Sequence, residues 1–336
     1  MNVAKSWTAK LDDYVIDLAW SPDAGMLAAA SAAGPVALFD GTSGARLHEL
    51  AGHADGTNAV AWMPAGPVLA SGGQDGCVRF WNASGGNQTA EVKLGAAWVE
   101  QLAWRPGPGA SCLAAAAGRR LSFIGPVGEI THAFADAPKT LSALAWDPRG
   151  GGVAVAWFGG VCVWDGTDFH SRHQYVTAGG VQALCWSPDG RWLVAGAQDN
   201  AVHLWLPEED QEFHMSGYET KVRELSFSPD SRWLATGGAR DACVWDCSGA
   251  GPEGREPLAL PHADRVCGVA FQRRGGLLAT AAQSNEVNLW DPARGEAPVA
   301  SVRLTAPASQ LAWSPDDTRL AIGSQQGGVL VLRVDA

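Results

Sequence analysis

Several features are scarce in this 336-residue sequence, and each scarcity excludes a class of protein. Lysine is rare, with five among the 24 Lys and Arg residues, which face 35 Asp and Glu. The net charge of -11 argues against nucleic acid or a membrane surface as partner, because both attract basic patches. No run approaches the roughly 20 apolar residues of a transmembrane helix, and the N-terminus lacks the apolar segment of a secretory signal. We therefore expect a cytoplasmic protein.

Cysteine is also scarce and carries no recognisable motif. The seven cysteines are an odd number, and no two of them form a C-x-x-C pair. Most lie in apolar runs such as 183–186. This pattern is typical of buried free thiols in a reducing compartment rather than of a disulfide framework.

Tryptophan, in contrast, is abundant and periodic. There are 16 Trp against three Tyr, and many end the pattern apolar-x-x-apolar-small-aromatic-x-Pro. Eight aromatic anchors of this pattern follow one another at intervals of 40 to 44 residues: Trp20, Trp62, Trp104, Trp146, Trp186, Phe227, Phe271 and Trp313. Internal repeats of this length indicate a repeat architecture.

Each repeat contains four strand-like segments. The anchor segment ends in a turn of the Pro-Asp-Gly type, as at 188–190, and two further apolar runs and one polar run follow. Four antiparallel strands per repeat are typical of a propeller blade. The sequence therefore predicts one all-β domain over residues 1–336, an eight-bladed propeller, with seven blades as the alternative.

The ends of the third segments resemble the WD40-repeat family. Trp-Asp pairs occur at 164–165, 245–246 and 290–291, and a Gly-His pair at 52–53. The resemblance implies that the ring is closed by the N-terminal segment. Residues 3–11 would supply the fourth strand of the last blade, 308–334, so that its sheet edge is paired.

The resemblance also implies a buried polar network in the second repeat. His53, Ser71, Asp75 and Trp81 occupy the matching places. Such a tetrad satisfies buried donors and acceptors and exposes no nucleophile, so we interpret it as structural and not as a catalytic triad.

Partner-binding positions are implied on one rim of the ring. In this family they flank the start of each first strand or precede the tetrad Asp. Trp98 and Trp157 come from neighbouring blades and predict an aromatic hot spot. The complete set is Tyr14, Gln74, Trp98, Glu100, Trp157, Gln182, Gln198, Lys221, Arg223, Arg265, Gln283 and Gln325.

The predicted function is a non-enzymatic scaffold, monomeric on its own, that presents this rim to other proteins or peptides. No cofactor or metal is predicted, because no His and carboxylate residues have metal-ligand spacing. One alternative is a hydrolase or lactonase with a metal or polar site in the central channel, for which Asp17, Glu100 and Gln182 are the candidates. Another alternative is a reader of a linear peptide motif. Fold alone does not decide among these functions.

Overall fold

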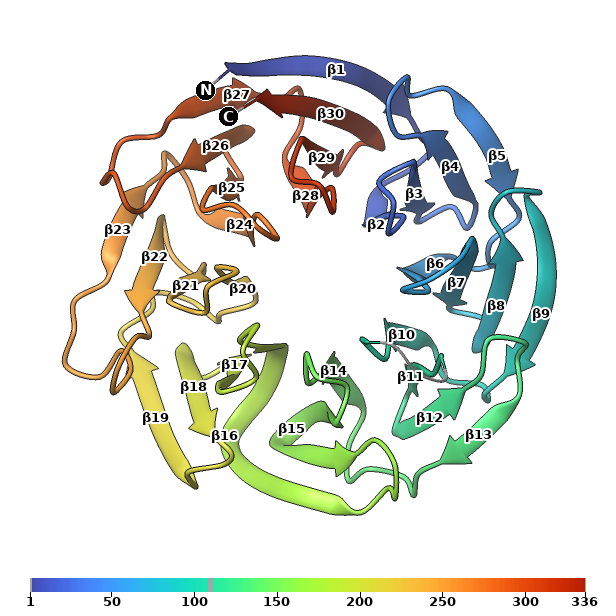
Figure 1. Ribbon diagram of the computed structural model, residues 1–336, viewed down its shortest axis with the longest axis horizontal. Helices are drawn as coiled ribbons and strands as arrows, with labels where there is room; N and C mark the ends of the chain where they lie inside the picture. The colour runs from blue at the N-terminus through green and yellow to red at the C-terminus, as the bar shows by residue number, and fades with distance from the viewer. Residues whose placement is uncertain (1, 108–110, 336) are drawn as a thin grey trace.

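The computed structural model describes residues 2–107 and 111–335, which form a ring of β-sheets around a central channel (Figure 1). These ranges contain thirty strands. No helix in the described residues is long and apolar enough to cross a membrane. The eight repeat anchors lie on eight inner strands. The strands that follow each anchor strand lie successively farther from the channel.

The first four repeats run from the inner to the outer edge of the ring in chain order. They comprise β2 (Val15–Trp20), β3 (Met26–Ser31), β4 (Val36–Asp40) and β5 (Arg46–Leu50), then β6 (Thr57–Trp62), β7 (Val68–Gly73), β8 (Cys77–Asn82) and β9 (Asn87–Lys93), then β10 (Val99–Trp104), β11 (Leu113–Ala117), β12 (Arg120–Ile124) and β13 (Ile130–Ala133), and β14 (Leu141–Trp146) with β15 (Gly152–Asp165).

The remaining strands continue around the ring, and the N-terminal strand joins the last of them. They are β16 (Ser171–Trp186), β17 (Leu193–Ala197), β18 (Ala201–Leu206), β19 (Gln211–Ser216), β20 (Leu225–Phe227), β21 (Trp233–Thr236), β22 (Asp241–Asp246), β23 (Leu258–Pro261), β24 (Val266–Phe271), β25 (Leu278–Ala282), β26 (Glu286–Trp290), β27 (Ala300–Arg303), β28 (Ala308–Trp313), β29 (Arg319–Ser324), β30 (Gly328–Asp335) and β1 (Asn2–Lys10).

The prediction of eight separate four-stranded blades is wrong, because the hydrogen-bonded sheets of the described chain number seven. Six sheets have four strands, and the seventh has six strands in the order β14-β15-β16-β17-β18-β19. The fourth and fifth repeats therefore share one sheet. When a blade is counted as one hydrogen-bonded sheet, the propeller has seven blades.

Two long strands cause this fusion. The backbone N–H of Gly166 donates to the Gly151 carbonyl at 3.0 Å, so β15 folds back on itself near Gly159, where φ is +101°. The half of β15 after the fold-back pairs with β16, and Phe158 just before it pairs with Gly180. From there β16 continues inward to pair with β17 (Figure 1). The fourth and fifth repeats are therefore joined in one sheet through β16, although the register is irregular between Phe158 and Gly160.

The predicted closure by the N-terminal strand is confirmed. β1 pairs antiparallel with β30 from Asn2 opposite Asp335 to Lys10 opposite Gly328. The sheet that results has the order β1-β30-β29-β28. The outer edge of β30 is thereby covered, which removes an unpaired strand edge.

In the six repeats whose anchor is Trp, the anchor connects the repeat to the one before it. The indole N–H of Trp62 donates to the Ala19 carbonyl at 2.9 Å, and that of Trp20 donates to Ala312 at 3.0 Å, which links the first repeat to the last. Trp104, Trp146, Trp186 and Trp313 make the equivalent bond. The recurring Trp therefore serves both as apolar core between sheets and as a hydrogen-bond donor along the ring.

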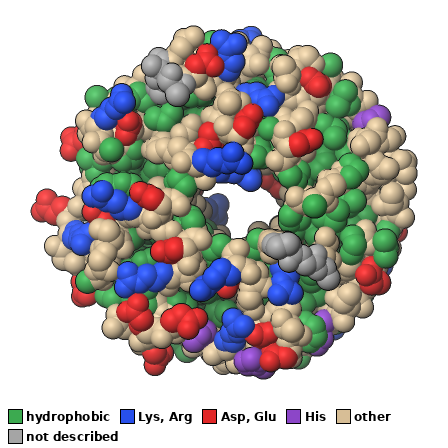
Figure 2. All heavy atoms as spheres, viewed as in Figure 1, with side chains coloured by type: hydrophobic (Ala, Val, Ile, Leu, Met, Phe, Trp, Pro, Cys, Tyr) green, Lys and Arg blue, Asp and Glu red, His purple; other side chains and the backbone are tan. Residues whose placement is uncertain are grey.

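Arginines in the turns add a second set of links between repeats. Arg149 Nη2 donates to the Gly190 carbonyl at 3.4 Å and Arg191 Nη1 donates to Gly249 at 2.9 Å, each in the next repeat. Arg319 Nη2 reaches Ala24 at 3.1 Å, from the last repeat to the first. Figure 2 shows basic and acidic side chains interspersed over much of the visible face, with a mainly hydrophobic surface on one flank of the channel.

Candidate partner-binding surface

The predicted rim positions lie at one end of the ring, which we call the rim face. It consists of the starts of the inner strands and the turns between the second and third strands of each repeat. Backbone hydrogen bonds join the two: Gln283 N–H donates to the Arg265 carbonyl at 2.9 Å, and Gln198 N–H to Gly180 at 2.9 Å. Gln74 and Gln325 donate in the same way to Gly56 and Pro307.

Half of the predicted rim residues converge on one cavity of the rim face, which has a volume of about 250 Å³. It lies where the starts of β2, β24 and β28 face the segment that leads into β20. The predicted residues that line it are Tyr14, Lys221, Arg223, Arg265, Gln283 and Gln325. We call it the rim cavity.

Three cations and one carboxyl group give the rim cavity its charge. Lys221, Arg223 and Arg265 are exposed, whereas Glu224 is half-buried. Burial raises the pKa of Glu224 above its ordinary value. Arg223 Nε donates to Gln182 Oε1 at 3.2 Å, so a seventh predicted residue borders the cavity. The site suits a negatively charged group.

The two predicted hot-spot tryptophans differ in exposure. Trp98 is 51% exposed at the start of β10, whereas Trp157 is half-buried and packs in the apolar cluster of the third and fourth repeats. The next residue, Phe158, is 59% exposed at the fold-back of β15. Sequence reasoning missed Phe158, although the following Gly159-Gly160 marks a tight turn that leaves its neighbours at the surface.

The other predicted rim residues lie apart from the rim cavity. Gln74 and Glu100 are half-buried and Gln198 is exposed; burial raises the pKa of Glu100. Asp17, a candidate for channel chemistry, accepts backbone N–H bonds from Leu18 at 2.8 Å and from Val60 at 2.9 Å. Desolvation raises the pKa of Asp17 to about 6. Its carboxylate thus joins the first and second repeats.

Beneath the rim face, the four tetrad residues of the second repeat form a hydrogen-bonded chain. His53 Nδ1 donates to Asp75 Oδ1 at 2.8 Å, and Ser71 Oγ lies 2.9 Å from His53 Nε2. Trp81 Nε1 donates to Ser71 Oγ at 2.9 Å. Desolvation lowers the pKa of His53, so the ring is neutral at neutral pH. The hydroxyl of Ser71 is fully buried and is inaccessible to a substrate.

The sixth repeat contains a variant of this network that sequence reasoning missed. Tyr218 Oη lies 2.9 Å from Thr236 Oγ1 and accepts a bond from Trp245 Nε1 at 2.9 Å. Tyr218 precedes Thr236 by 18 residues, the separation that also joins His53 to Ser71 and His262 to Thr280. That spacing was the available signal, and tyrosine replaces histidine in it.

This network, the ring and the terminal closure agree with the comparisons with known proteins. A family model described as "WD domain, G-beta repeat" matches residues 44–82, 166–205, 210–246 and 256–291. The chain is a WD40-repeat β-propeller. The four matched segments contain the best-preserved Trp places, whereas Phe39, Ile124 and Leu332 replace Trp elsewhere.

Two further comparisons place this WD40 propeller among known proteins. It is 25% identical over 191 residues to a protein of Arabidopsis thaliana named "Cell division cycle 20.1, cofactor of APC complex". The match covers 52% of this chain but only 40% of that relative's length. The crystal structure of the computationally designed Ika8 protein is similar in fold, with a TM-score of 0.82, 18% identity and coverage of 97% and 98% of the two chains.

Two groups of potential metal ligands occur in the WD40 propeller that sequence spacing did not reveal. Asp199, His203 and His214 have ligand atoms within 4.8 Å of one another because β18 and β19 place the two histidines opposite each other. His203 Nε2 already lies 3.0 Å from Asp199 Oδ2. It takes the place that Arg79 has beside Asp75 in the second repeat, which is a structural role.

In the second group, Asp165, Asp168 and His170, the Asp165 carboxylate is also occupied by bonds within the protein. Desolvation acts to raise the pKa of Asp165, but backbone bonds from Asp168 and Thr167 and the Arg172 guanidinium lower it to about 2. The carboxylate therefore has its donors and its counter-charge from the protein itself.

A cavity of about 600 Å³ occupies part of the central channel. Its walls are anchor aromatics and the prolines that follow them, including Trp20, Trp62 and Pro64. Arg273 carries the only charge among its lining residues. Hydrolytic chemistry of the predicted alternative type needs convergent carboxylates or histidines, and the lining of this cavity supplies neither.

Proposed function

We propose that this WD40 propeller is a non-enzymatic scaffold that binds partner proteins on its rim face. The observation that carries the proposal is the convergence of Lys221, Arg223 and Arg265 on one cavity of a chain with net charge -11. A local excess of positive charge gives orientation and selectivity toward an acidic segment of a partner. The Arabidopsis relative is named as a cofactor of a complex, which supports a role as an adaptor.

Rigid display is the proposed mechanism. The closed ring holds the rim cavity and the exposed aromatic side chains of Trp98 and Phe158 in fixed positions, so little ordering cost arises on binding. Aromatic anchors contribute most of the affinity of many interfaces, and surrounding charges select the partner. We also place the protein in the cytoplasm, since its seven cysteines are free thiols, which suit a reducing compartment.

Affinity capture from native lysate with quantitative mass spectrometry tests the proposal. The full chain is compared with Lys221→Glu/Arg223→Glu and with the matched control Lys139→Glu/Arg294→Glu. Both double variants change the net charge by the same amount, and all four positions are exposed. We expect the rim variant to lose its dominant partner by about tenfold or more and the control to retain it.

Circular dichroism and thermal melting verify that both variants fold. Equal capture by the rim variant and the full chain would contradict the proposed rim face. Equal losses in the rim variant and the control would also contradict it, because the binding would then depend on net charge alone.

A further inference from the structure

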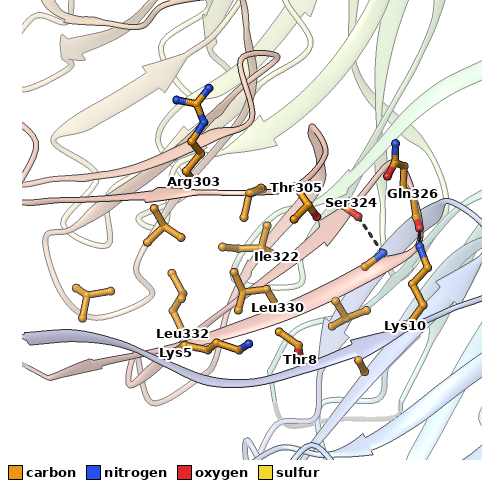
Figure 3. Close-up of a pocket in the computed structure, with 16 residues that line it drawn as sticks. Lys5, Thr8, Lys10, Arg303, Thr305, Ile322, Ser324, Gln326, Leu330 and Leu332 are labelled. Atoms are coloured by element: carbon orange, nitrogen blue, oxygen red, sulfur yellow. Dashed lines mark hydrogen bonds between the residues drawn. The ribbon is translucent and has the colours of Figure 1, made fainter.

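An apolar groove opens on the side of the ring, away from the rim cavity. It has a volume of about 500 Å³ and lies between β27 of the seventh repeat and β1 with β30 of the last sheet (Figure 3). Its apolar lining comes from both walls and from the strands behind them: Val3, Val302, Leu304, Ile322, Val329, Leu330 and Leu332.

The charge of this groove is opposite to that of the whole chain. Lys5 and Lys10 lie along β1 on the groove side, whereas Arg303 on β27 shares the face of Glu286 and directs its side chain away from the groove (Figure 3). None of the residues that line the groove is an Asp or a Glu. Arg303 lies opposite Glu286 in the strand register, but the described chain has no ion pair between them. Lys5 makes no ion pair in the described chain either, so its ammonium can meet a ligand.

A β-bulge places both lysines on the groove side. Lys5 and Lys10 are five residues apart, so a regular strand would direct them to opposite faces. The register of β1 shifts between Lys5 and Trp7, where Lys5 pairs with Leu332 and Trp7 with Val331. The shift also turns Trp7 toward the first repeat, where its Nε1 donates to the Gly41 carbonyl at 3.1 Å. Bulges re-aim side chains in this way and often occur beside binding sites.

One of the lysines is already partly held. Lys10 Nζ donates to the Gln326 carbonyl, which fixes the ammonium at the end of the groove. An ammonium has three donors, so two remain for a ligand. Lys5 and Lys10 pair with Leu332 and Gly328, which are four residues apart on β30, so the two lysines are separated by about 13 Å at ~3.3 Å per residue.

We propose that this groove binds an extended segment of a partner protein in which acidic and aliphatic residues alternate. In an extended peptide, alternate side chains face opposite ways. One set of aliphatic side chains can therefore cover the half-buried Val302, Leu304 and Leu330, while the intervening acids meet Lys5 and Lys10 at the β1 edge. The groove follows β1, which suits an extended ligand more than a helix.

The groove and the rim cavity share no lining residue. Binding at the groove and binding at the rim face can therefore be tested independently. The test uses a phage-displayed library of random nine-residue peptides, selected in parallel on the full chain, on the groove variant Lys5→Glu/Lys10→Glu and on the control Lys139→Glu/Arg294→Glu. We expect the full chain and the control to enrich peptides with alternating acidic and aliphatic residues, and the groove variant to lose them.

Fluorescence polarisation with one enriched peptide then measures the effect. We expect binding to be at least about tenfold weaker for the groove variant, and similarly weaker when Asn and Gln replace the peptide's acids. The Lys221→Glu/Arg223→Glu variant should bind the peptide normally.

Four results would overturn the proposal: no enrichment at all, a consensus without acids, equal binding by the groove variant, or displacement of the peptide by phosphatidylserine vesicles. Self-association of the full chain that is lost in the groove variant would overturn it too, since a second copy would then be the occupant.

Discussion

At the scale of single residues, the buried polar networks differ from repeat to repeat in how completely they are satisfied. Ser71 accepts the indole N–H of Trp81 in the second repeat, and Thr280 accepts that of Trp290 at 2.7 Å in the seventh. The fifth repeat has Trp205 in the same place but Ala195 where the hydroxyl would be. Trp205 Nε1 is buried without a hydrogen-bond partner in the described chain.

Ala195→Ser should therefore stabilise the protein. The new hydroxyl stands where Ser71 does and can accept from Trp205 Nε1, which removes an unsatisfied donor and adds about 1 kcal/mol to the free energy of unfolding. Urea denaturation measures the change.

Ala29→Ser is the matched control, because Phe39 holds the Trp place in the first repeat and offers no donor. The buried hydroxyl should cost about 1–3 kcal/mol there. If both variants lose the same stability, the network is not what determines the effect.

Asp17 gives stability a pH dependence of a defined sign. Its folded pKa is about 6, above the ordinary value, so the folded state binds the proton more tightly than the unfolded state. The contribution of Asp17 is fully favourable below about pH 4 and is lost as the pH rises through about 6. We expect Asp17→Asn, which keeps an oxygen for the Val60 N–H, to remove this dependence.

The measurement compares unfolding free energies of the wild type and Asp17→Asn from pH 4 to pH 7.5. The difference should move in favour of Asp17→Asn as the pH rises, whatever other groups contribute to both proteins. A difference that is constant over this range would contradict the raised pKa.

At the scale of elements, β1 both completes the last sheet and packs on the first repeat. Trp7 is 6% exposed and lies in the apolar cluster that also holds Trp20, Phe39 and Val331. The element therefore joins the two ends of the ring by packing as well as by strand pairing, and its loss would leave β30 with an open edge.

Trp7→Ala should cost about 3–5 kcal/mol, since a large buried side chain leaves a cavity. Trp98→Ala is the control of equal chemical change, and its exposed position should keep the effect within about 0.5 kcal/mol. Thermal or chemical denaturation of the two variants distinguishes them. Similar losses in both would mean either that Trp98 is structural or that β1 contributes little.

At the scale of the whole molecule, the sequence was most informative where one signal repeats. The aromatic anchors predicted every inner strand, because each anchor must bury a large side chain between neighbouring sheets. The resemblance to the WD40 family predicted the closure by residues 3–11. The predicted number of blades was wrong, because the fourth and fifth repeats share one sheet. That sharing depends on strand pairing around Phe158, Gly159 and Gly180, which hydrophobic patterns do not report. The side groove was also missed, because a bulge changes which face Lys5 and Lys10 occupy.

The candidate rim was predictable only in part. Its residues follow from the position of each strand start, so seven of them could be placed at or beside one cavity. Exposure was not predictable, as Trp157 and Phe158 demonstrate: the turn at Gly159 decides which aromatic reaches solvent. Tyr218 was missed because histidine and tyrosine look unrelated, although both place a polar ring atom beside a buried hydroxyl.

The central claim, that partners bind the rim face, is tested most directly by hydrogen–deuterium exchange of the full chain with and without its captured dominant partner. We predict slower exchange in residues 218–224 and 264–267 and at the starts of β2 and β28, with unchanged exchange in the turns that carry Arg149, Arg191 and Arg232 on the opposite face. Protection confined to those turns, or no change around Lys221 and Arg265, would contradict the claim.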